Sequence, residues 1–217
     1  MHRAALRLFA AHGFEATGIR KIAEEAGITV ASLYHYLGTK EDLLERMMLE
    51  SMTELLAPAH VLTGSVTDPG ERIAGLVDSH VRRHAQEQQL CRVGDTEIRS
   101  LSPARRAGVI ALRDSYQAIW EEAVMSGVRS GLFAVPDVKL ATFALLQMCT
   151  GVAYWYNPRG PLSLDEISAA FVKMALALLS GDAAPDGRGL VDGVRAATPT
   201  ASNNKKAVPG GKTRHGR

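Results

Sequence analysis

Apolar side chains recur every three or four residues along most of the first 180 positions, and glycine and proline fall between these stretches. This spacing gathers apolar side chains on one face of an α-helix, whereas a half-buried strand would show strict alternation. The pattern predicts an all-α fold with nine helices. Because 46% of the 217 residues are hydrophobic, the chain can bury a substantial core.

The boundaries of these helices follow from capping and breaking residues. Thr39 with Asp42, and Ser163 with Glu166, have the spacing of capping boxes. Pro58 and the segment from Thr63 to Gly70 are expected to break the helical pattern after the fourth helix. The expected helices run from about His2 to Ala11, Gly18 to Glu25, Val30 to Tyr36, Lys40 through Leu55, Glu71 to Glu87, Cys91 to Leu101, Pro103 to near Gly131, Asp137 to Tyr156, and Ser163 to near Leu179.

Residues 17 to 40 contain the pattern of a helix-turn-helix. Two short helices meet at Gly27, where the turn needs a positive φ that glycine adopts without strain. Ala23 is small enough for the helices to cross closely, and Ile28 and Leu33 supply the apolar contacts that hold the second on the first. One or two of these features occur by chance in other helical hairpins, whereas the full set indicates DNA binding.

The stretch from Ala4 to Leu44 resembles the N-terminal domain of the TetR/AcrR family of transcriptional regulators. The resemblance lies in Ala-Leu-Arg-Leu-Phe-Ala, in Ile-Arg-Lys-Ile-Ala-Glu-Glu-Ala-Gly-Ile, and in Ser-Leu-Tyr-His-Tyr-Leu-Gly-Thr-Lys-Glu-Asp-Leu-Leu. It implies a three-helix DNA-binding domain over residues 1–45, followed by a helical ligand-binding and dimerisation domain over 46–180. It also implies a homodimeric repressor that a small-molecule inducer releases from palindromic operator DNA.

The helix from Val30 to Tyr36 would then be the recognition helix in the major groove. Short side chains at its beginning can approach base edges, and nearby hydroxyl and basic groups suit phosphate oxygens. The expected DNA contacts are Thr17, Arg20, Thr29, Val30, Ala31, Ser32, Tyr34, His35, Tyr36 and Lys40. Val30, Ala31 and Ser32 are assigned to bases, Arg20 to a base or a phosphate, and core packing is the alternative for Tyr34.

The stretch from Glu97 to Arg106, the stretch from Leu112 to Tyr116 and the later stretch from Trp155 to Ile167 are similar to the sensor domains of family members that control fatty-acid, steroid or aromatic-acid breakdown. That resemblance implies an acyl-CoA thioester as inducer, and the alternative is a multidrug-responsive repressor of an efflux pump. The residues expected to bind the ligand are Arg99, Arg113, Tyr116, Trp120, Phe143 and Met148, although each aromatic residue can equally be core and each arginine surface.

Dimerisation is expected from two strongly apolar helices near the end of the second domain. The interface residues expected are Leu145, Val152, Tyr156, Ile167, Phe171, Met174 and Leu178. The run between Lys139 and Arg159 carries no charge, but polar residues dilute it, so a helix at a subunit interface is preferred to a membrane span.

The net charge of +2 is unevenly distributed, because residues 181–217 carry seven Lys or Arg against three Asp. This segment is rich in Gly, Ala, Pro, Asn and Lys and has no apolar face, so it is expected to be a disordered basic tail.

Cys91 and Cys149 are expected to be packing residues of a protein in a reducing, cytoplasmic compartment. His80 and His84 have metal-ligand spacing but no further ligand set, and no motif of an enzyme or of a cofactor site is recognised.

Overall fold

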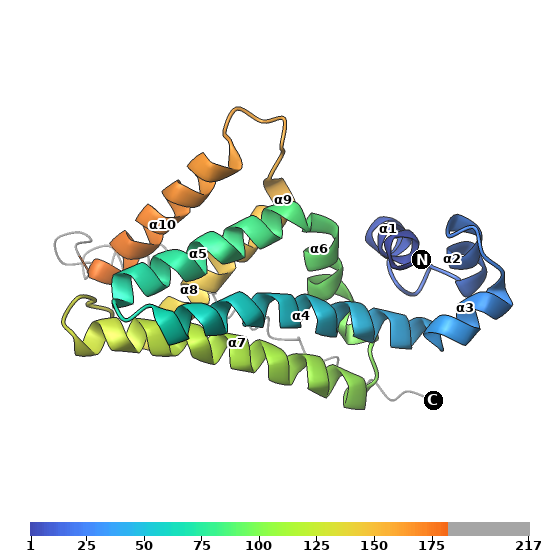
Figure 1. Cartoon of the computed structure of the whole chain (residues 1–217), viewed down its shortest axis with the longest axis horizontal. Helices are drawn as coiled ribbons and strands as arrows, with labels where there is room; N and C mark the ends of the chain where they lie inside the picture. The colour runs from blue at the N-terminus through green and yellow to red at the C-terminus, as the bar shows by residue number, and fades with distance from the viewer. Residues whose placement is uncertain (182–217) are drawn as a thin grey trace, which may run out of the picture. The chain divides into compact units, whose positions relative to one another are not determined.

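Every regular element between residues 1 and 181, the part that the computed structural model describes, is a helix (Figure 1). Residues 182–217, where the basic tail was expected, and the side chains of Tyr36 and Leu37 lie outside this description. The elements are α1 (His2–His12), α2 (Ile19–Glu25), α3 (Val30–Leu37), α4 (Lys40–Ser65), α5 (Pro69–Gln86), α6 (Gln88–Glu97), the 3-10 helix η1 (Ile98–Ser100), α7 (Pro103–Arg129), α8 (Val138–Thr150), α9 (Val152–Trp155) and α10 (Leu164–Ser180).

Two of the helix starts carry complete capping boxes, as the sequence predicts. The Thr39 hydroxyl accepts a hydrogen bond from the Asp42 amide, and the Asp42 carboxylate accepts one from the Thr39 amide at 2.6 Å. Ser163 and Glu166 repeat this arrangement at the start of α10. These reciprocal bonds satisfy amide donors that the first helical turn leaves free. The box at Thr39 sets where the long helix α4 begins, directly after the helix-turn-helix.

Pro58 does not end the fourth helix, which is a correction to the expected boundary. Helix α4 continues through Pro58 to Ser65. A proline inside a helix removes one backbone hydrogen bond, at a cost of about 3 kcal/mol. Leu55, Leu56 and Ala59 on either side are buried in the larger core, where α4 packs on α5 and α7. This tertiary packing outweighs the local preference of the proline.

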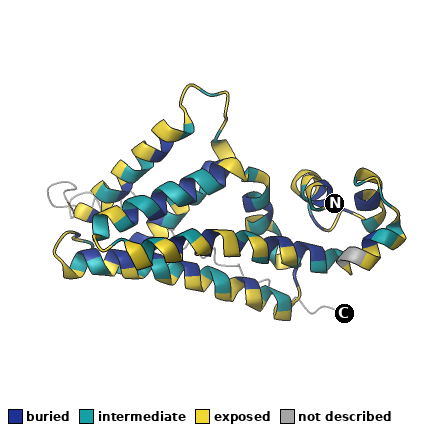
Figure 2. Cartoon of the chain, in the orientation of Figure 1, coloured by how far each residue is buried: buried dark blue, intermediate teal, exposed yellow. Residues whose placement is uncertain are grey.

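The larger core lies among α4, α5, α7, α8 and α10, around the fully buried Trp120. Figure 2 shows the resulting pattern, with the buried side of each helix turned toward its neighbours and the exposed side outward. The apolar run after Asp137 is divided at Gly151 into α8 and the short α9. No helix within residues 1–181 is long and apolar enough to cross a membrane.

The smaller core belongs to α1, α2, α3 and the first turns of α4, with Phe9, Ile22 and Leu33 buried at its centre. It is completed by apolar residues from much later in the chain. Val93 of α6 and Val109 of α7 are 2% and 0% exposed and belong to the same cluster. The N-terminal helices therefore do not enclose a core by themselves, and helices of the second half of the chain contribute to it.

Candidate DNA-binding surface and effector cavity

Helices α2 and α3 form the predicted helix-turn-helix. Gly27 has a φ of +66° in the turn between them, and Ala23 and Leu33 are 1% and 0% exposed at their contact. Thr29 caps α3, because its hydroxyl accepts the Ser32 amide at 3.1 Å. The cap and the buried Leu33 hold α3 in place while its opposite side remains accessible.

The side chains expected to contact bases lie at the accessible beginning of α3. Ala31 is exposed, and Val30 and Ser32 are partly exposed. Tyr34 is 52% exposed, so its side chain is not a core residue. Arg20, Thr29 and His35 are exposed as well. The fold thus gathers most of the expected DNA contacts on one accessible region, while Tyr36 is described only by its backbone.

Thr17 is a correction to the expected DNA contacts. Its side chain is 0% exposed, and its hydroxyl donates to the backbone oxygen of Gly13 at 2.7 Å. The oxygen of Leu8 lies at 3.3 Å from the same hydroxyl. A threonine in a segment between helices was expected to reach a phosphate oxygen, but its methyl group is buried and its hydroxyl ties the α1–α2 connection to α1. Thr17 therefore stabilises the connection between α1 and α2 from within the N-terminal core.

Lys40 has a structural partner that the sequence did not reveal. Its ammonium donates to the backbone oxygen of Phe14 at 2.8 Å and lies 4.0 Å from the centre of the Phe14 ring. The start of α4 is therefore joined to the α1–α2 connection by a charge-assisted hydrogen bond and a cation–π contact. Any phosphate contact made by Lys40 would use the other hydrogens of the ammonium group.

A cavity of about 580 Å³ opens among helices α4 to α9, within the range of small-molecule sites. Its lining residues are Met48, Ser51, Met52, Leu55, His80, His84, Leu90, Cys91, Gly94, Asp95, Val109, Arg113, Tyr116, Gln117, Leu146, Gln147, Thr150, Gly151 and Tyr154. Most of these are apolar or uncharged, and the His, Asp and Arg side chains lie in two places. One is a histidine pair on α5, and the other is a charged group between α6 and α7.

The histidine pair belongs to a hydrogen-bonded chain across the cavity wall. His80 Nδ1 lies 3.0 Å from the Tyr116 hydroxyl, and His80 Nε2 lies 3.0 Å from the Thr150 hydroxyl. The ring of His84 stacks on that of His80. Burial lowers the pKa of His80 well below its usual value and raises the pKa of the Tyr116 hydroxyl above its usual value, so both groups stay neutral.

The charged group lies between α6, α7 and α9. Arg113 donates to the Gly94 oxygen at 2.9 Å and lies 3.6 Å from the Asp95 carboxylate. Burial raises the pKa of Asp95, against the opposing effect of Arg113 and of a hydrogen bond from Tyr154. Because Tyr154 is 54% exposed, this charged group stands where the cavity meets solvent.

Two of the six residues expected to bind the ligand, Arg113 and Tyr116, line the cavity. Trp120 is fully buried beside Tyr116, and Met148 packs against the larger core. Phe143 is 43% exposed on α8, and Arg99 is exposed on η1. His80 and His84, whose spacing is also that of metal ligands, both line the cavity. Within residues 1–181 there is no group of three or more His, Cys, Asp or Glu side chains that could hold a metal ion.

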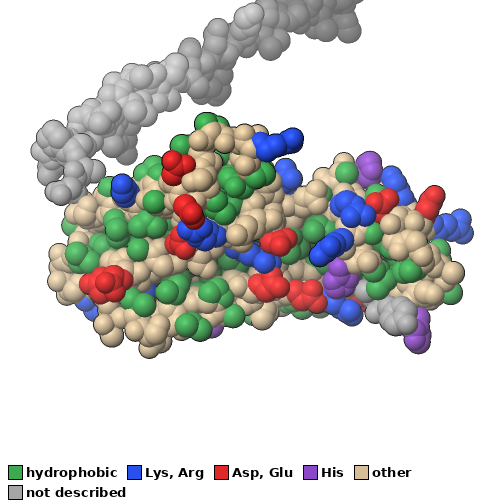
Figure 3. All heavy atoms as spheres, turned by 45° about the horizontal axis from the view of Figure 1, so that its top comes forward, with side chains coloured by type: hydrophobic (Ala, Val, Ile, Leu, Met, Phe, Trp, Pro, Cys, Tyr) green, Lys and Arg blue, Asp and Glu red, His purple; other side chains and the backbone are tan. Residues whose placement is uncertain are grey.

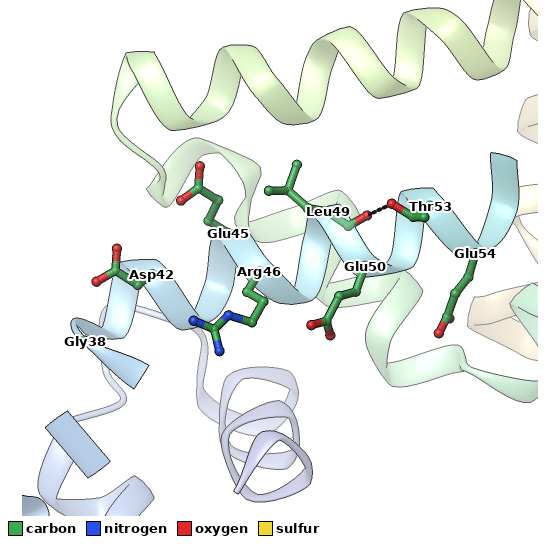
Figure 4. Close-up of a pocket in the computed structure, with 8 residues that line it drawn as sticks. All are labelled: Gly38, Asp42, Glu45, Arg46, Leu49, Glu50, Thr53 and Glu54. Carbon is green, nitrogen blue, oxygen red and sulfur yellow. Dashed lines mark hydrogen bonds between the residues drawn. The ribbon is translucent and has the colours of Figure 1, made fainter. Parts of the chain in front are cut away.

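A second hollow, of about 690 Å³, follows α4 from Gly38, at the end of α3, onward. Figure 4 shows Gly38, Asp42, Glu45, Arg46, Leu49, Glu50, Thr53 and Glu54 along its length. Four carboxylates and one guanidinium line it, and three of the carboxylates are paired with Arg105 or Arg83 from other helices. The cavity among α4 to α9 has the more apolar lining and is therefore the better candidate for a ligand with an apolar part.

Helix α6 has one side in the cavity and the other in the N-terminal core. Cys91, Gly94 and Asp95 line the cavity, while Val93 is buried with residues of α1 and α4. Helix α6 also packs directly on α1. Helix α6 therefore contacts both the cavity and the residues of α1 and α4 in the N-terminal core.

A second connection joins the beginnings of α4 and α7. The Arg105 guanidinium of α7 forms ion pairs with Asp42 and Glu45 and lies 3.7 Å from Glu41. The backbone N–H of Ser102 donates to Glu41 at 2.6 Å, and the Ser102 side chain makes no capping bond. The start of α7 is thus attached to the first turns of α4, directly after the recognition helix.

The residues expected at a dimer interface fall into two groups. Leu145, Val152 and Ile167 are 0%, 0% and 5% exposed, so they belong to the core of one chain, and the expectation for these three is corrected. Met174 and Leu178 of α10 are 47% and 40% exposed, while Tyr156 and Phe171 are partly buried. A helical stripe of apolar residues has the same sequence pattern in a core and in an interface, so the pattern alone does not distinguish the two.

Further large apolar side chains are exposed on the same helices. Leu140 and Phe143 of α8 are 65% and 43% exposed, and Trp155 of α9 is 53% exposed with its ring 6.0 Å from that of Phe171. Figure 3 shows hydrophobic side chains reaching the surface over much of the larger part of the molecule. Contiguous exposed apolar patches are typical of interaction surfaces.

Two family models together match most of the described chain. Residues 3–47 match the model described as bacterial regulatory proteins, tetR family, and residues 66–179 match the tetracyclin repressor-like C-terminal domain. The HTH-type transcriptional repressor KstR2 of Mycolicibacterium smegmatis is 28% identical over 179 residues, which cover 79% of this chain and 85% of that protein.

Solved structures show the same similarity. The regulator PfmR of Thermus thermophilus is 31% identical with a TM-score of 0.75, over 81% of this chain and 96% of that one. AibR, crystallised with isovaleryl coenzyme A and operator DNA, is 26% identical with a TM-score of 0.72, over 80% of this chain and 96% of that one. The chain belongs to the TetR family of helix-turn-helix DNA-binding transcriptional regulators, which are not enzymes.

Proposed function

We propose that this protein is a repressor that binds a palindromic operator as a homodimer and is released from it by an acyl-CoA thioester. The observation that carries the proposal is the double contact of α6. One side of this helix lines a cavity of ligand size, and Val93 on its other side is buried in the core of the DNA-binding helices. Occupation of the cavity and the position of the recognition helix are thereby linked.

On the operator, α3 lies in the major groove with Val30, Ala31 and Ser32 next to base edges. Tyr34, Thr29 and the other exposed polar groups around it contact phosphates and set the orientation of the helix. Lys40 keeps its proposed phosphate contact, and His35 remains a proposed DNA contact. Together these contacts combine sequence recognition with affinity for the backbone.

The homodimer is proposed to form through α8 and α10, with Met174, Leu178 and Phe143 in the interface. A closed two-fold pair would cover these exposed apolar side chains on both copies. It would also present two α3 helices to the two halves of a palindrome. The expected dimer contacts of Tyr156 and Phe171 remain part of this proposal.

An acyl-CoA is favoured as effector by the neutral, mostly apolar interior of the cavity and by the relatives. The acyl group would enter the cavity, while Arg113, and Arg99 outside it, remain the proposed partners of the CoA phosphates. AibR was crystallised with isovaleryl coenzyme A, which supports an acyl-CoA effector. KstR2 is described as a transcriptional repressor, which supports repression. A repressor of an efflux pump that responds to cationic drugs is the competing function, and the test below separates the two.

Release follows from population shift. An effector lowers operator affinity only if it binds the released conformation more tightly than the DNA-bound one. An acyl group pressing on Cys91 and Gly94 of α6 would favour a conformation in which α1 and the start of α4 have moved. The two recognition helices of the dimer would then no longer match successive major grooves.

The experiment measures fluorescence anisotropy of an operator duplex, selected from a random DNA library by the full-length protein. Acyl-CoAs of two to twelve carbons are each added to the complex, with free CoA as the matched control. We expect at least one acyl-CoA to lower operator affinity tenfold or more, about 1.4 kcal/mol, and free CoA to have little effect. Should cationic dyes lower the affinity while every acyl-CoA leaves it unchanged, the efflux-pump function replaces the proposed one.

A further inference from the structure

His84 has a ring nitrogen whose hydrogen-bonding state the fold determines. Its Nδ1 lies 2.9 Å from the backbone oxygen of His80. A carbonyl oxygen only accepts, so Nδ1 must carry the proton and donate it. In the neutral ring Nε2 is then an acceptor with a free lone pair.

The surroundings keep the His84 ring neutral. Burial, together with the positive charge of Arg83, lowers the pKa of His84 to about 4, although the bond to the His80 oxygen opposes this change. The side chain is 5% exposed and faces the stacked, equally buried ring of His80. At neutral pH the ring therefore offers an uncharged acceptor rather than a cation.

The acceptor has no partner within residues 1–181, although His84 lines the cavity. His80 differs, because both of its ring nitrogens are hydrogen-bonded, to Tyr116 and to Thr150. The Nε2 atom is not among the fully buried unpartnered atoms, so it is reachable from the cavity, and a bound molecule that supplies a donor to it gains affinity. Water can fill this position in the free protein and would be displaced.

We propose that His84 Nε2 accepts a hydrogen bond from a hydroxyl group on the acyl chain of the effector, so that the cavity selects hydroxylated acyl groups. This inference rests on the proposed function, because it assumes that the acyl group enters this cavity. Thioester, ester and ketone oxygens only accept and cannot bind a bare Nε2. A carboxylate would require proton uptake by a ring whose surroundings disfavour charge. A hydroxyl donates without any change of charge.

The test uses the full-length protein and three matched thioesters: hexanoyl-CoA, 3-hydroxyhexanoyl-CoA and 5-hydroxyhexanoyl-CoA. Their affinities are measured by calorimetry at pH 7.5. At least one hydroxylated thioester should bind about tenfold more tightly than hexanoyl-CoA, because one buried hydrogen bond is gained. In His84→Leu the hydroxylated and unsubstituted thioesters should bind about equally. His84→Gln, whose amide oxygen can accept a hydrogen bond, should retain part of the preference. His60→Leu, on the exposed surface of α4, is the control and should keep the full preference.

The nitrogen-15 resonances of His84 in the unmodified protein give a second readout that does not depend on how the variants fold. The free protein should show a proton on Nδ1 and none on Nε2, and a hydroxylated ligand should shift Nε2 while its unsubstituted counterpart does not. Methyl 3-hydroxyhexanoate, methyl 5-hydroxyhexanoate and methyl hexanoate carry the same acyl groups without CoA, and each is titrated by calorimetry and by the nitrogen-15 measurement.

These outcomes separate the two claims. If the thioesters do not bind but the hydroxylated esters keep their preference, the CoA proposal fails and the assignment of His84 stands. If neither series shows a preference for the hydroxyl, or if Nε2 is protonated in the free protein at neutral pH, the assignment of His84 is wrong.

Discussion

The imidazole rings of His80 and His84 lie parallel in the cavity wall, with 4.0 Å between their centroids and 5° between their planes. One turn of α5 separates them, so the spacing of the two side chains comes from the helix and the parallel stacking from the packing around them. Both rings are buried, and His84 disfavours a positive charge on His80.

Acid should destabilise the protein through these two residues. Their pKa values are lower in the folded chain than the ordinary 6.5, to about 4 for His84 and well below 6.5 for His80. As the pH falls from about 6.5 toward 4, the unfolded chain binds more protons than the folded chain. The contribution of the two histidines to the free energy of unfolding is therefore at its maximum above this window and decreases within it. Each histidine contributes a slope of about 1.4 kcal/mol per pH unit at most.

Urea unfolding between pH 4 and pH 7.5 measures this slope. His84→Leu should remove about half of the part due to the pair, and His60→Gln, which alters an exposed imidazole of α4, should leave it unchanged. Burial raises the pKa of Asp95, which stabilises the fold as the pH falls and opposes the histidines. Differences between the variants are therefore compared, and an unchanged slope in His84→Leu would contradict the prediction.

Replacing Ala31 should alter which operators are preferred. Ala31→Leu adds volume at the exposed beginning of α3, and we expect changes of about 1–3 kcal/mol among half-sites that differ by one base pair. Tyr34→Phe removes an exposed hydroxyl assigned to phosphate and should weaken binding about equally on all half-sites. Anisotropy titrations on a set of point-mutated operators measure both effects.

The control for Ala31→Leu is the same substitution at Ala104, which is exposed on α7. Ala104→Leu should leave the ranking of half-sites unchanged. An unchanged ranking in Ala31→Leu as well would show that α3 does not lie in the major groove.

Arg105 should stabilise the protein in a salt-dependent manner. It is shared by three carboxylates on the first turns of α4, and such networks contribute more than isolated surface pairs. Arg105→Gln should lower the melting temperature by a few degrees in dilute salt, and the difference should shrink as added salt screens the network. Arg129→Gln, which removes a single exposed pair with Glu122 on the same helix, should have no measurable effect. Equal effects of both substitutions would argue against a special role for Arg105.

Leu178 should be necessary for the dimer. A glutamate there would place a charge among the apolar side chains that α8 and α10 expose, so Leu178→Glu should be monomeric in light scattering and should bind a palindrome much more weakly. Ile110→Glu is a closely matched control, because Ile110 of α7 is 41% exposed and Leu178 is 40% exposed. If Leu178→Glu remains a dimer while Ile110→Glu dissociates, the interface has been assigned to the wrong helices.

Much of the local structure could be predicted from short patterns. The capping boxes at Thr39 and Ser163, the turn at Gly27 and the order of the helices depend on residues within a few positions of one another. The local preference of Pro58 predicts a helix break, but the burial of its neighbours against α5 and α7 overcomes this preference. The histidine pair was visible as a spacing of four, but the spacing did not indicate a cavity.

The sequence by itself determined that the chain is helical and that it carries a helix-turn-helix, because helix periodicity, caps and turn glycines act over short distances. Only the tertiary structure decided which apolar stripes are core and which are exposed, that Thr17 is buried, and that Val93 completes the N-terminal core. It also decided that His84 faces a cavity built from six helices. These properties depend on residues far apart in the chain, and periodicity places a side chain on a helix face without indicating what that face contacts.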